Sequence, residues 1–173
     1  MRIIGLAGWS GSGKTTLVTR LIPRLVARGL RVSTVKHAHH SFEIDQPGKD
    51  SHAHRAAGAI EVLIGAQSRW ALVHELRAAA EPPLRELLAK LSPVDLVLIE
   101  GYKRAPHPKL EVHRAVLRQP LLSANDPTIV AIASDRPLRE ANVPVINLDD
   151  VDGIVDSLIR HAAPLDAALA LTV

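Results

Sequence analysis

The sequence predicts an α/β fold in which a mostly parallel central sheet carries helices on both faces. Short apolar runs rich in Val, Ile and Leu alternate with segments of helical periodicity, which is the pattern of strands joined by crossover helices. The residues are 47% hydrophobic but only 2% aromatic, so the core is aliphatic, as suits helices packed on parallel strands. The 173 residues show no repeat and no linker, and we expect one domain.

A glycine-rich loop makes this expectation more specific. Residues Gly8–Thr15 read Gly-Trp-Ser-Gly-Ser-Gly-Lys-Thr and match the phosphate-binding pattern G-x-x-x-x-G-K-[ST]. An apolar run over 2–7 predicts a strand before the loop, and a helix is expected over 14–28, so the motif has the strand–loop–helix context that its chemistry requires. The alternative is a glycine turn with an incidental Lys-Thr pair, and it does not explain the strand expected before the loop or the helix expected after it. We therefore expect the three-layer P-loop NTPase fold, with residues 1–173 as one nucleotide-binding domain.

The loop itself supplies the phosphate-binding groups. Its glycines let the backbone approach phosphates closely, and its N–H groups and the start of the helix offer partial positive charge. Lys14 is expected to reach the β- and γ-phosphates, and the Thr15 hydroxyl to ligate Mg²⁺. The predicted nucleotide-binding residues of the loop are Ser10, Gly11, Ser12, Gly13, Lys14, Thr15 and Thr16.

In the first half of the chain the other elements follow from periodicity and turn residues. The helix over 14–28 carries Leu17, Leu21 and Leu25 four residues apart, and Gly29 ends it. The remaining elements are a strand over 31–36, a polar stretch to about residue 48, a short helix over 50–57, and strands over 60–64 and 70–73 joined by a turn at 65–68.

In the second half, two prolines open a helix that is expected over 82–91. The most continuous apolar run, 94–99, predicts a central strand. Residues 101–126 combine three prolines, several charges and weak periodicity, so we expect mostly loop with one or two short strands. The last elements are strands over 128–132 and 143–146, a helix from Asp149 or Asp150 to His161, and after Pro164 either a helix or an interface segment.

Two charged residues are expected to join the loop in one site. Glu100 closes the strand over 94–99, and ligands of open α/β sheets bind beyond the carboxyl ends of the strands. Glu100 can hold Mg²⁺ or orient an attacking water, or it can simply cap the following turn. Lys36 closes the strand over 31–36, where a second lysine stabilises charge on the transferred phosphoryl group. The predicted catalytic residues are Lys14, Lys36 and Glu100.

The polar stretch after residue 36 adds further candidates. Asp45 or Asp50 could complete the Mg²⁺ shell, with Asp50 the residue chosen beside Thr15 and Glu100; a turn aspartate and a helix cap are the alternatives. Five histidines lie between residues 37 and 54, and they suit either a Zn²⁺ or Ni²⁺ site, anion contacts or a polar switch loop. The five are His37, His39, His40, His52 and His54.

Base recognition has a single candidate. Guanine is usually read by a carboxylate that accepts from the base N–H groups, and the motif Asn-Lys-x-Asp is absent. Asp135 follows the strand over 128–132, where a base-reading loop is expected, and a plain turn aspartate is the alternative.

Composition narrows the class of protein and its partners. The chain has no cysteine, which excludes disulfides and thiolate metal sites. It has no run long and apolar enough for a membrane span and no leader pattern, so we expect a cytoplasmic protein without a membrane partner. The net charge of +3 is small and the few aromatic residues are scattered, which argues against a nucleic-acid partner.

Taken together, these motifs resemble the accessory (adapter) protein B family of molybdopterin-guanine dinucleotide biosynthesis (MobB), a family of P-loop NTPases. The resemblance spans residues 1–115 in family order and is loose in the last third, where it rests on 133–135 and on length. The matching pieces are Gly8–Thr16, Val35–His40, Phe42–Asp45, Pro47–Ser51, Arg69–Leu72 and Leu98–Lys103.

The resemblance implies a GTP-binding protein with weak GTPase activity that uses Mg²⁺. Such proteins assist the guanylyltransferase that joins GMP to molybdenum-bound molybdopterin, so the implied partners are that enzyme and the molybdenum cofactor. It also implies a homodimer with sheets joined across the interface. The Glu-Gly pair at the end of a central strand in dethiobiotin synthetase resembles Glu100-Gly101, which favours the Mg²⁺ role of Glu100.

Two other functions compete with the adapter. A small-molecule kinase or ligase would use Lys36 and the histidine-rich edge to hold an acceptor, and a metallochaperone would use the histidines alone. ATP also competes with GTP, because the base-reading expectation rests on one aspartate.

Overall fold

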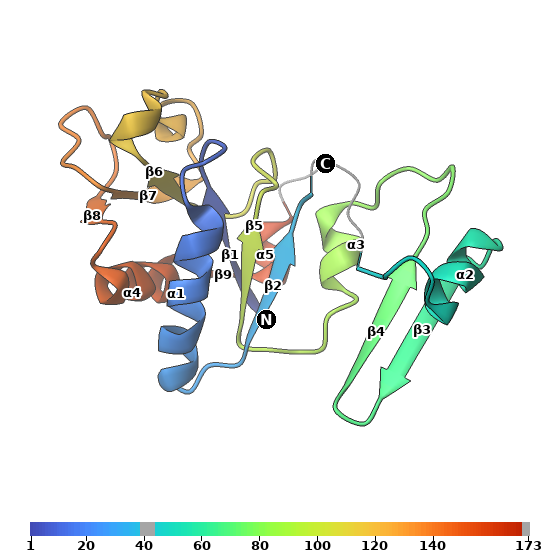
Figure 1. Cartoon of the computed structure of the whole chain (residues 1–173). Coiled ribbons are helices and arrows are strands. Elements are labelled where there is room, and N and C mark those ends of the chain that lie inside the picture. The colour runs from blue at the N-terminus through green and yellow to red at the C-terminus, as the bar shows by residue number, and fades with distance from the viewer. Residues whose placement is uncertain (39–43, 171–173) are drawn as a thin grey trace. The chain divides into compact units, whose positions relative to one another are not determined.

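The computed structural model describes residues 1–38 and 44–170, and they form two compact units (Figure 1). The first unit contains Met1–His37 and Leu84–Val173, and the second contains Ala38–Pro83. The sequence predicts one domain over residues 1–173, and the structure divides this domain into the two units. No helix among the described residues is long and apolar enough to cross a membrane.

The first unit is built on a seven-stranded sheet in the order β2-β5-β1-β6-β7-β8, with β9 paired to β1. The pairs along that order are parallel, and only β9 runs antiparallel to its neighbour. The mostly parallel sheet confirms the expected α/β class. Its strands are β1 (Arg2–Ala7), β2 (Val32–Lys36), β5 (Leu96–Glu100), β6 (Lys109–His113), β7 (Ile129–Ser134), β8 (Val145–Asn147) and β9 (Ala163–Pro164).

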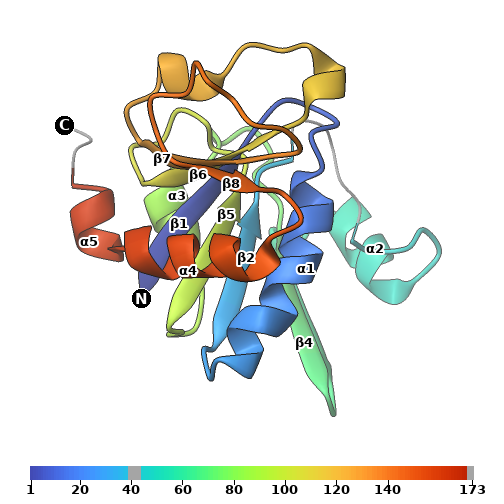
Figure 2. The same cartoon turned by 90° about the vertical axis from the view of Figure 1, so that its left-hand side faces the viewer.

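Helices cover both faces of this sheet. On one face, α1 (Lys14–Ala27) and α4 (Val151–His161) lie side by side and enclose a core with Ile4 and Leu6 of β1 (Figure 2). On the other, α3 (Leu84–Leu88) and α5 (Leu165–Ala168) pack on Ile3 of β1. Because successive side chains of a strand point to opposite faces, β1 is covered on both sides, and it is apolar and buried from Ile3 to Ala7.

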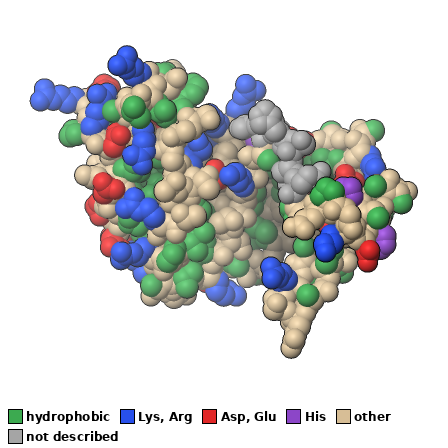
Figure 3. All heavy atoms as spheres, in the orientation of Figure 1, with side chains coloured by type: hydrophobic (Ala, Val, Ile, Leu, Met, Phe, Trp, Pro, Cys, Tyr) green, Lys and Arg blue, Asp and Glu red, His purple; other side chains and the backbone are tan. Residues whose placement is uncertain are grey.

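The helix over 14–28 was predicted closely, and α1 buries the three leucines that predicted it, Leu17, Leu21 and Leu25. Asp150 caps α4, where its Oδ1 accepts a hydrogen bond from the Gly153 amide at 2.9 Å. Basic side chains of α1 pair with acidic side chains at α4, and the two signs lie next to one another on the face seen in Figure 3. The pairs are Arg20–Asp149, Arg24–Asp152 and Arg28–Asp156.

Residues 101–126 are mostly loop with one short strand, β6, as expected, but the sequence did not indicate where this strand pairs. A single strand of this region, β6, lies inside the sheet between β1 and β7, and all five of its residues are buried. Its polar side chains Lys109, Glu111 and His113 alternate with Leu110 and Val112, a pattern that indicates a strand with one solvated face. In the structure each of these polar side chains has a polar partner within the protein.

These partners come from segments that follow β6. Lys109 forms an ion pair with Asp126 at 3.3 Å, and the Glu111 carboxylate accepts from two backbone amides, Leu122 N at 2.8 Å and Ser123 N at 3.0 Å. His113 lies 3.3 Å from the Ser134 hydroxyl. Short 3₁₀ helices at Ala115–Leu117 and Leu122–Ala124 lie in the segment between β6 and β7.

The helix expected over 82–91 is shorter, and only Leu84–Leu88 is helical.

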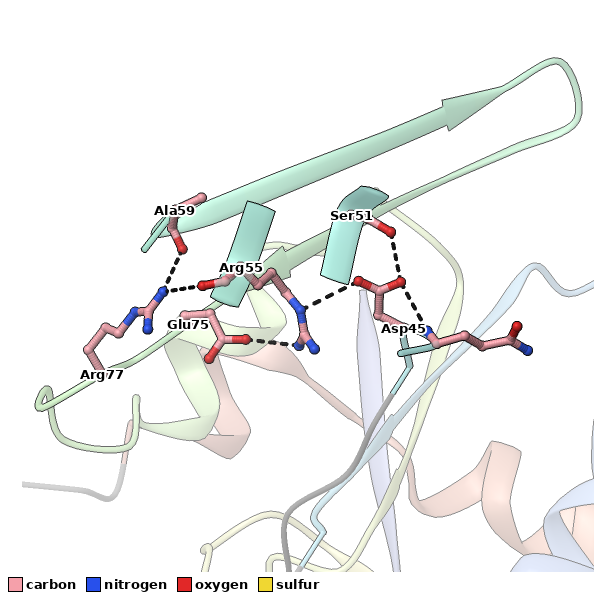
Figure 4. A network of polar contacts seen from close by, with 7 residues as sticks. Asp45, Ser51, Arg55, Ala59, Glu75 and Arg77 are labelled. Carbon is pink, nitrogen blue, oxygen red and sulfur yellow. Dashed lines mark hydrogen bonds and ion pairs between the residues drawn. The ribbon is translucent and has the colours of Figure 1, made fainter. Parts of the chain in front are cut away.

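The second unit consists of α2 (Asp50–Ala56) and an antiparallel hairpin of β3 (Glu61–Ala66) and β4 (Arg69–His74). The two strands expected over 60–64 and 70–73 are therefore confirmed, as a sheet of their own. A polar network ties α2 to the end of the hairpin: Arg55 pairs with Asp45 at 3.5 Å and with Glu75 at 2.9 Å (Figure 4). Arg77 closes the network by donating to the carbonyls of Arg55 and Ala59 (Figure 4).

One face of the hairpin is apolar and exposed. Leu63 and Leu72 lie opposite each other across the two strands, and Trp70 lies opposite Gly65 on the same face. The exposed fractions are 67% for Leu63, 68% for Trp70 and 46% for Leu72. Val62, on the opposite face, is buried, and β3 contacts α2. The hairpin thus has one exposed apolar face and one that is covered in part, at Val62.

Candidate nucleotide site

The glycine-rich loop follows β1 and ends where α1 begins. Gly13 is the N-cap of α1 and has φ 90° and ψ 21°, a left-handed conformation that glycine adopts without strain. The Ser12 amide donates to the Trp9 carbonyl at 3.1 Å and closes the turn of the loop. The first amides of α1 have no partner within the helix, as in any α-helix, so the loop and helix present N–H groups at this point.

Lys14 lies across the loop. Its Nζ donates to the carbonyls of Gly8 at 3.0 Å and Trp9 at 2.9 Å, and an ammonium group has a third hydrogen to donate. Burial lowers the pKa of Lys14; Glu100 opposes this effect, whereas the neighbouring cations Lys103 and Lys36 add to it. An anion placed beside Lys14 would favour its charged form and relieve the repulsion among these cations.

The structure brings Thr15, Lys36 and Glu100 together at the carboxyl edge of the sheet. The parallel register pairs Lys36 and Leu6 with Glu100, so the ends of β2 and β1 flank the end of β5. The Thr15 hydroxyl donates to Glu100 Oε1 at 2.9 Å, and Lys36 Nζ lies 3.4 Å from that hydroxyl and 3.6 Å from Glu100 Oε1. The Glu100 side chain is only 15% exposed.

The donor set of this cluster fits Mg²⁺. Mg²⁺ takes oxygen ligands and usually binds through one or two protein groups together with phosphate oxygens and water. Thr15 Oγ1 and Glu100 Oε1 are two such oxygens, and they are already adjacent. Lys36, whose side chain is 58% exposed, adds positive charge at the same place. The cluster can therefore hold a divalent cation and stabilise negative charge on a phosphoryl group.

The other loop residues predicted to bind phosphate differ in exposure. Ser12 is buried, and its hydroxyl has no partner among the described residues. Ser10, Gly11 and Thr16 are exposed at the loop and at the first turn of α1. Phosphate binding by these residues stays a prediction.

The two aspartates proposed for the Mg²⁺ shell both belong to the second unit. Asp50 begins α2, and its metal role stays a prediction. Asp45 is buried and accepts from the Ser51 hydroxyl at 2.7 Å and the Gln46 amide at 3.1 Å, in addition to its ion pair with Arg55 (Figure 4). Asp45 is therefore a structural member of the polar network.

Asp135 follows β7 and is exposed. Its Oδ1 accepts a hydrogen bond from the Ala115 amide at 3.0 Å, which caps the 3₁₀ helix at Ala115–Leu117. This contact fits the alternative of a structural turn aspartate, and base reading by Asp135 stays a prediction.

The histidine cluster is only partly described. His39 and His40, together with the Phe42-Glu43 pair of the family resemblance, lie outside the described residues. His37 follows β2, and its ring lies 4.7 Å from that of Tyr102, while His52 and His54 are on α2 of the second unit. Across residues 1–38 and 44–170, no group of three His, Cys, Asp or Glu side chains is arranged to hold a metal ion.

Sequence reasoning missed two residues beside the loop, Lys103 and Arg114. Trp9 Nε1 donates to the Pro120 carbonyl at 2.8 Å, and Lys103 Nζ lies 5.0 Å from the centre of the Trp9 ring. Arg114, directly after β6, has its guanidinium beside Gly13. The signal that could have identified Arg114 is its position at the end of a strand, but that strand was not placed next to β1.

Comparison with known proteins agrees with this fold and identifies the family. The family described as "Molybdopterin guanine dinucleotide synthesis protein B" matches residues 3–135. The chain is 39% identical over 161 residues to the molybdopterin-guanine dinucleotide biosynthesis adapter protein of Escherichia coli, covering 91% of each chain. It is 38% identical over 157 residues to the protein of that name in Haemophilus influenzae, covering 89% of this chain and 85% of the relative.

Solved structures of similar proteins share the fold. A crystal structure of molybdopterin-guanine biosynthesis protein B superposes with a TM-score of 0.72 at 27% identity, covering 91% of this chain and 98% of the other. The crystal structure of Bacillus subtilis MobB gives a TM-score of 0.69 at 26% identity, with 94% and 98% covered. The family match and the two relatives extend well beyond the phosphate-binding loop, and the chain belongs to the molybdopterin guanine dinucleotide synthesis protein B family.

Proposed function

We propose that this protein binds GTP with Mg²⁺, hydrolyses it slowly, and acts as an adapter in molybdopterin-guanine dinucleotide biosynthesis, where it supports the attachment of GMP to molybdopterin. The observation that carries the nucleotide part is the convergence of Lys14, Thr15, Lys36 and Glu100 at one sheet edge. The adapter part rests on two relatives that are named adapter proteins of this pathway, and the chain covers 91% and 85% of their length. Through that role the partners are the guanylyltransferase and the molybdenum cofactor.

The residues divide the work on the triphosphate. The loop amides and Lys14 hold the phosphates, while Thr15 and Glu100 supply oxygen ligands for Mg²⁺. When bound, Mg²⁺ neutralises charge that develops between the β- and γ-phosphates. Lys36 stabilises charge on the γ-phosphoryl group as water adds to phosphorus and the bond to the leaving GDP oxygen breaks. Glu100 accepts a hydrogen bond from Thr15 and so keeps that hydroxyl at the metal position.

A nucleotide titration tests this proposal directly. We expect GTP to bind more tightly than ATP in the presence of Mg²⁺, and hydrolysis to be slow without a small-molecule acceptor. Calorimetry with both nucleotides, followed by a phosphate-release assay, measures these properties. Tighter binding of ATP would contradict the base preference, and rapid turnover that appears only with a small acceptor would favour a kinase or ligase.

We also propose that the protein forms a homodimer through the hairpin of the second unit. The exposed face with Leu63, Trp70 and Leu72 and the unpaired edges of a two-stranded sheet are surfaces that a second copy can cover. Sedimentation of the wild type and of a Leu63→Glu variant tests this. A wild-type monomer, or a dimer that the substitution leaves intact, would exclude this interface.

A further inference from the structure

We infer that Arg114 binds the diphosphate part of the nucleotide, from the side of β1 opposite to Lys36 and Glu100. This inference deepens the proposed function and rests on it. It assigns to the site a positively charged side chain that comes from a different strand than the other members of the site.

The sheet order places Arg114 at the carboxyl edge of the first unit's sheet, where the loop after β1 also lies. β1 lies between β5 and β6, so residues that follow β5 and β6 flank the loop that follows β1. Lys36 and Glu100 end β2 and β5 on one side, and Arg114 directly follows the last residue of β6 on the other. The register pairs Ala7 with Glu111, which brings the ends of β1 and β6 to the same level.

The guanidinium lies against the loop at Gly13. A Cβ at Gly13 would be 3.5 Å from Arg114 Nε and 3.6 Å from its Nη2, which is ordinary van der Waals distance, so the guanidinium lies directly beside the loop backbone. Arg114 is half-buried, and no hydrogen bond or ion pair holds its side chain among residues 1–38 and 44–170. A partly desolvated guanidinium without an acceptor is costly, and an anion at the loop would supply the acceptor.

Contacts with the loop and with the end of β7 hold the segment that follows Arg114. Asp135 accepts from the Ala115 amide at 3.0 Å, and the Trp9 indole donates to the Pro120 carbonyl at 2.8 Å. Leu117 Cδ2 lies 3.7 Å from the Cβ position of Gly11. Because these contacts already order the chain around Arg114, binding an anion costs little further conformational entropy.

The position along the loop indicates which phosphates Arg114 contacts. The backbone of a phosphate-binding loop cradles the α- and β-phosphates, and Gly13 belongs to that cradle. Thr15, Lys36 and Glu100 form the Mg²⁺ end of the site instead. A planar guanidinium suits bidentate contact with two phosphate oxygens. GDP and GTP share this diphosphate, so Arg114 should contribute equally to the binding of both.

Nucleotide affinity measured on Arg114→Ala tests the inference. We expect the affinities for GDP and for GTP to fall together by about ten- to hundredfold, the range for losing a charge-assisted hydrogen bond, with the turnover number at saturation nearly unchanged. Arg114→Lys should restore part of the affinity because it keeps the charge. Arg118→Ala is the matched control, since it removes the same charge from an exposed residue of the same segment and should bind as the wild type does.

Four results would overturn the inference. If Arg114→Ala binds GDP within twofold of the wild type, Arg114 does not contact the diphosphate, and the proposed function stands. If Arg114→Ala also lowers the unfolding temperature without nucleotide and Arg114→Lys recovers nothing, the residue is structural. If turnover falls while GDP affinity is kept, Arg114 acts on the transition state. A wild type that binds no nucleotide with Mg²⁺ would remove the proposed function and the inference together.

Discussion

Lowering the pH should destabilise the fold through one buried histidine, His107. It precedes β6, is 0% exposed, and neither of its ring nitrogens has a hydrogen-bond partner among the described residues. It packs against Gly5 of β1, where any Cβ would collide with the imidazole. The pKa of His107 is lowered from 6.5 to about 4; burial is the main cause, the positive charge of Lys109 adds to it, and Asp126 opposes both effects.

The sign and size of the effect follow from proton linkage. A histidine with an ordinary pKa of 6.5 in the unfolded chain and about 4 in the folded chain binds its proton more readily when unfolded. The folded state is therefore penalised as the pH falls below 6.5, and the penalty is complete below 4. Since one pKa unit corresponds to about 1.4 kcal/mol, His107 should cost about 2 kcal/mol of stability at pH 5 relative to pH 7.5.

Urea unfolding of the wild type and of His107→Met at pH 7.5 and 5.0 measures this term. Methionine fills the space without a titratable group, so the variant should lose about 2 kcal/mol less than the wild type over this interval. The two proteins differ only at residue 107, so the comparison isolates the contribution of His107. His54→Gln, which changes an exposed histidine on α2, serves as the control and should behave as the wild type does. Parallel losses in the wild type and His107→Met would refute the reasoning.

Other substitutions have equally specific outcomes. Lys14→Ala should reduce GTP affinity roughly a hundredfold without unfolding the protein, because its Nζ contacts the loop and not the core; calorimetry would show the assignment wrong if affinity were unchanged. Glu100→Gln should lower Mg²⁺-dependent hydrolysis more than GTP binding, and equal losses in the two assays would make Glu100 structural. Asp150→Ala should cost about 1 kcal/mol in urea unfolding through the lost cap of α4, and no change would show that water replaces it.

The sequence predicted the nucleotide end of the site well, for a local reason. The loop, its strand and its helix are contiguous, so the pattern over residues 2–28 already contains the conformational requirements of the motif. Lys36 and Glu100 followed from a single rule, that the ends of parallel strands meet at one edge, and the structure places both next to Thr15. The Mg²⁺ role of Asp50 is still a prediction. Thr15 and Glu100 belong to the first unit, whereas Asp50 belongs to the second.

β6 shows where such reasoning fails. A strand that alternates Lys109, Glu111 and His113 with aliphatic residues is indistinguishable in sequence from one with a solvated face. What pairs these side chains is a set of partners 11 to 17 residues further along the chain, such as Asp126 for Lys109 and the amides of Leu122 and Ser123 for Glu111. Burying a charge is costly unless it is paired, so the strand is compatible with the core only once those partners are in place.

The sequence by itself determined the fold class, the phosphate-binding loop and the family, because each depends on residues close together in the chain or on simple periodicity. Only the tertiary structure decided that β6 lies beside β1, and with it that the Arg114 guanidinium lies beside Gly13. The tertiary structure also decided that Asp135 accepts a hydrogen bond from the Ala115 amide, directly after Arg114. The physical reason is that strand order and the pairing of buried polar groups are set by long-range contacts. Local sequence shows which residues can make those contacts, and the folded chain selects which of them it makes.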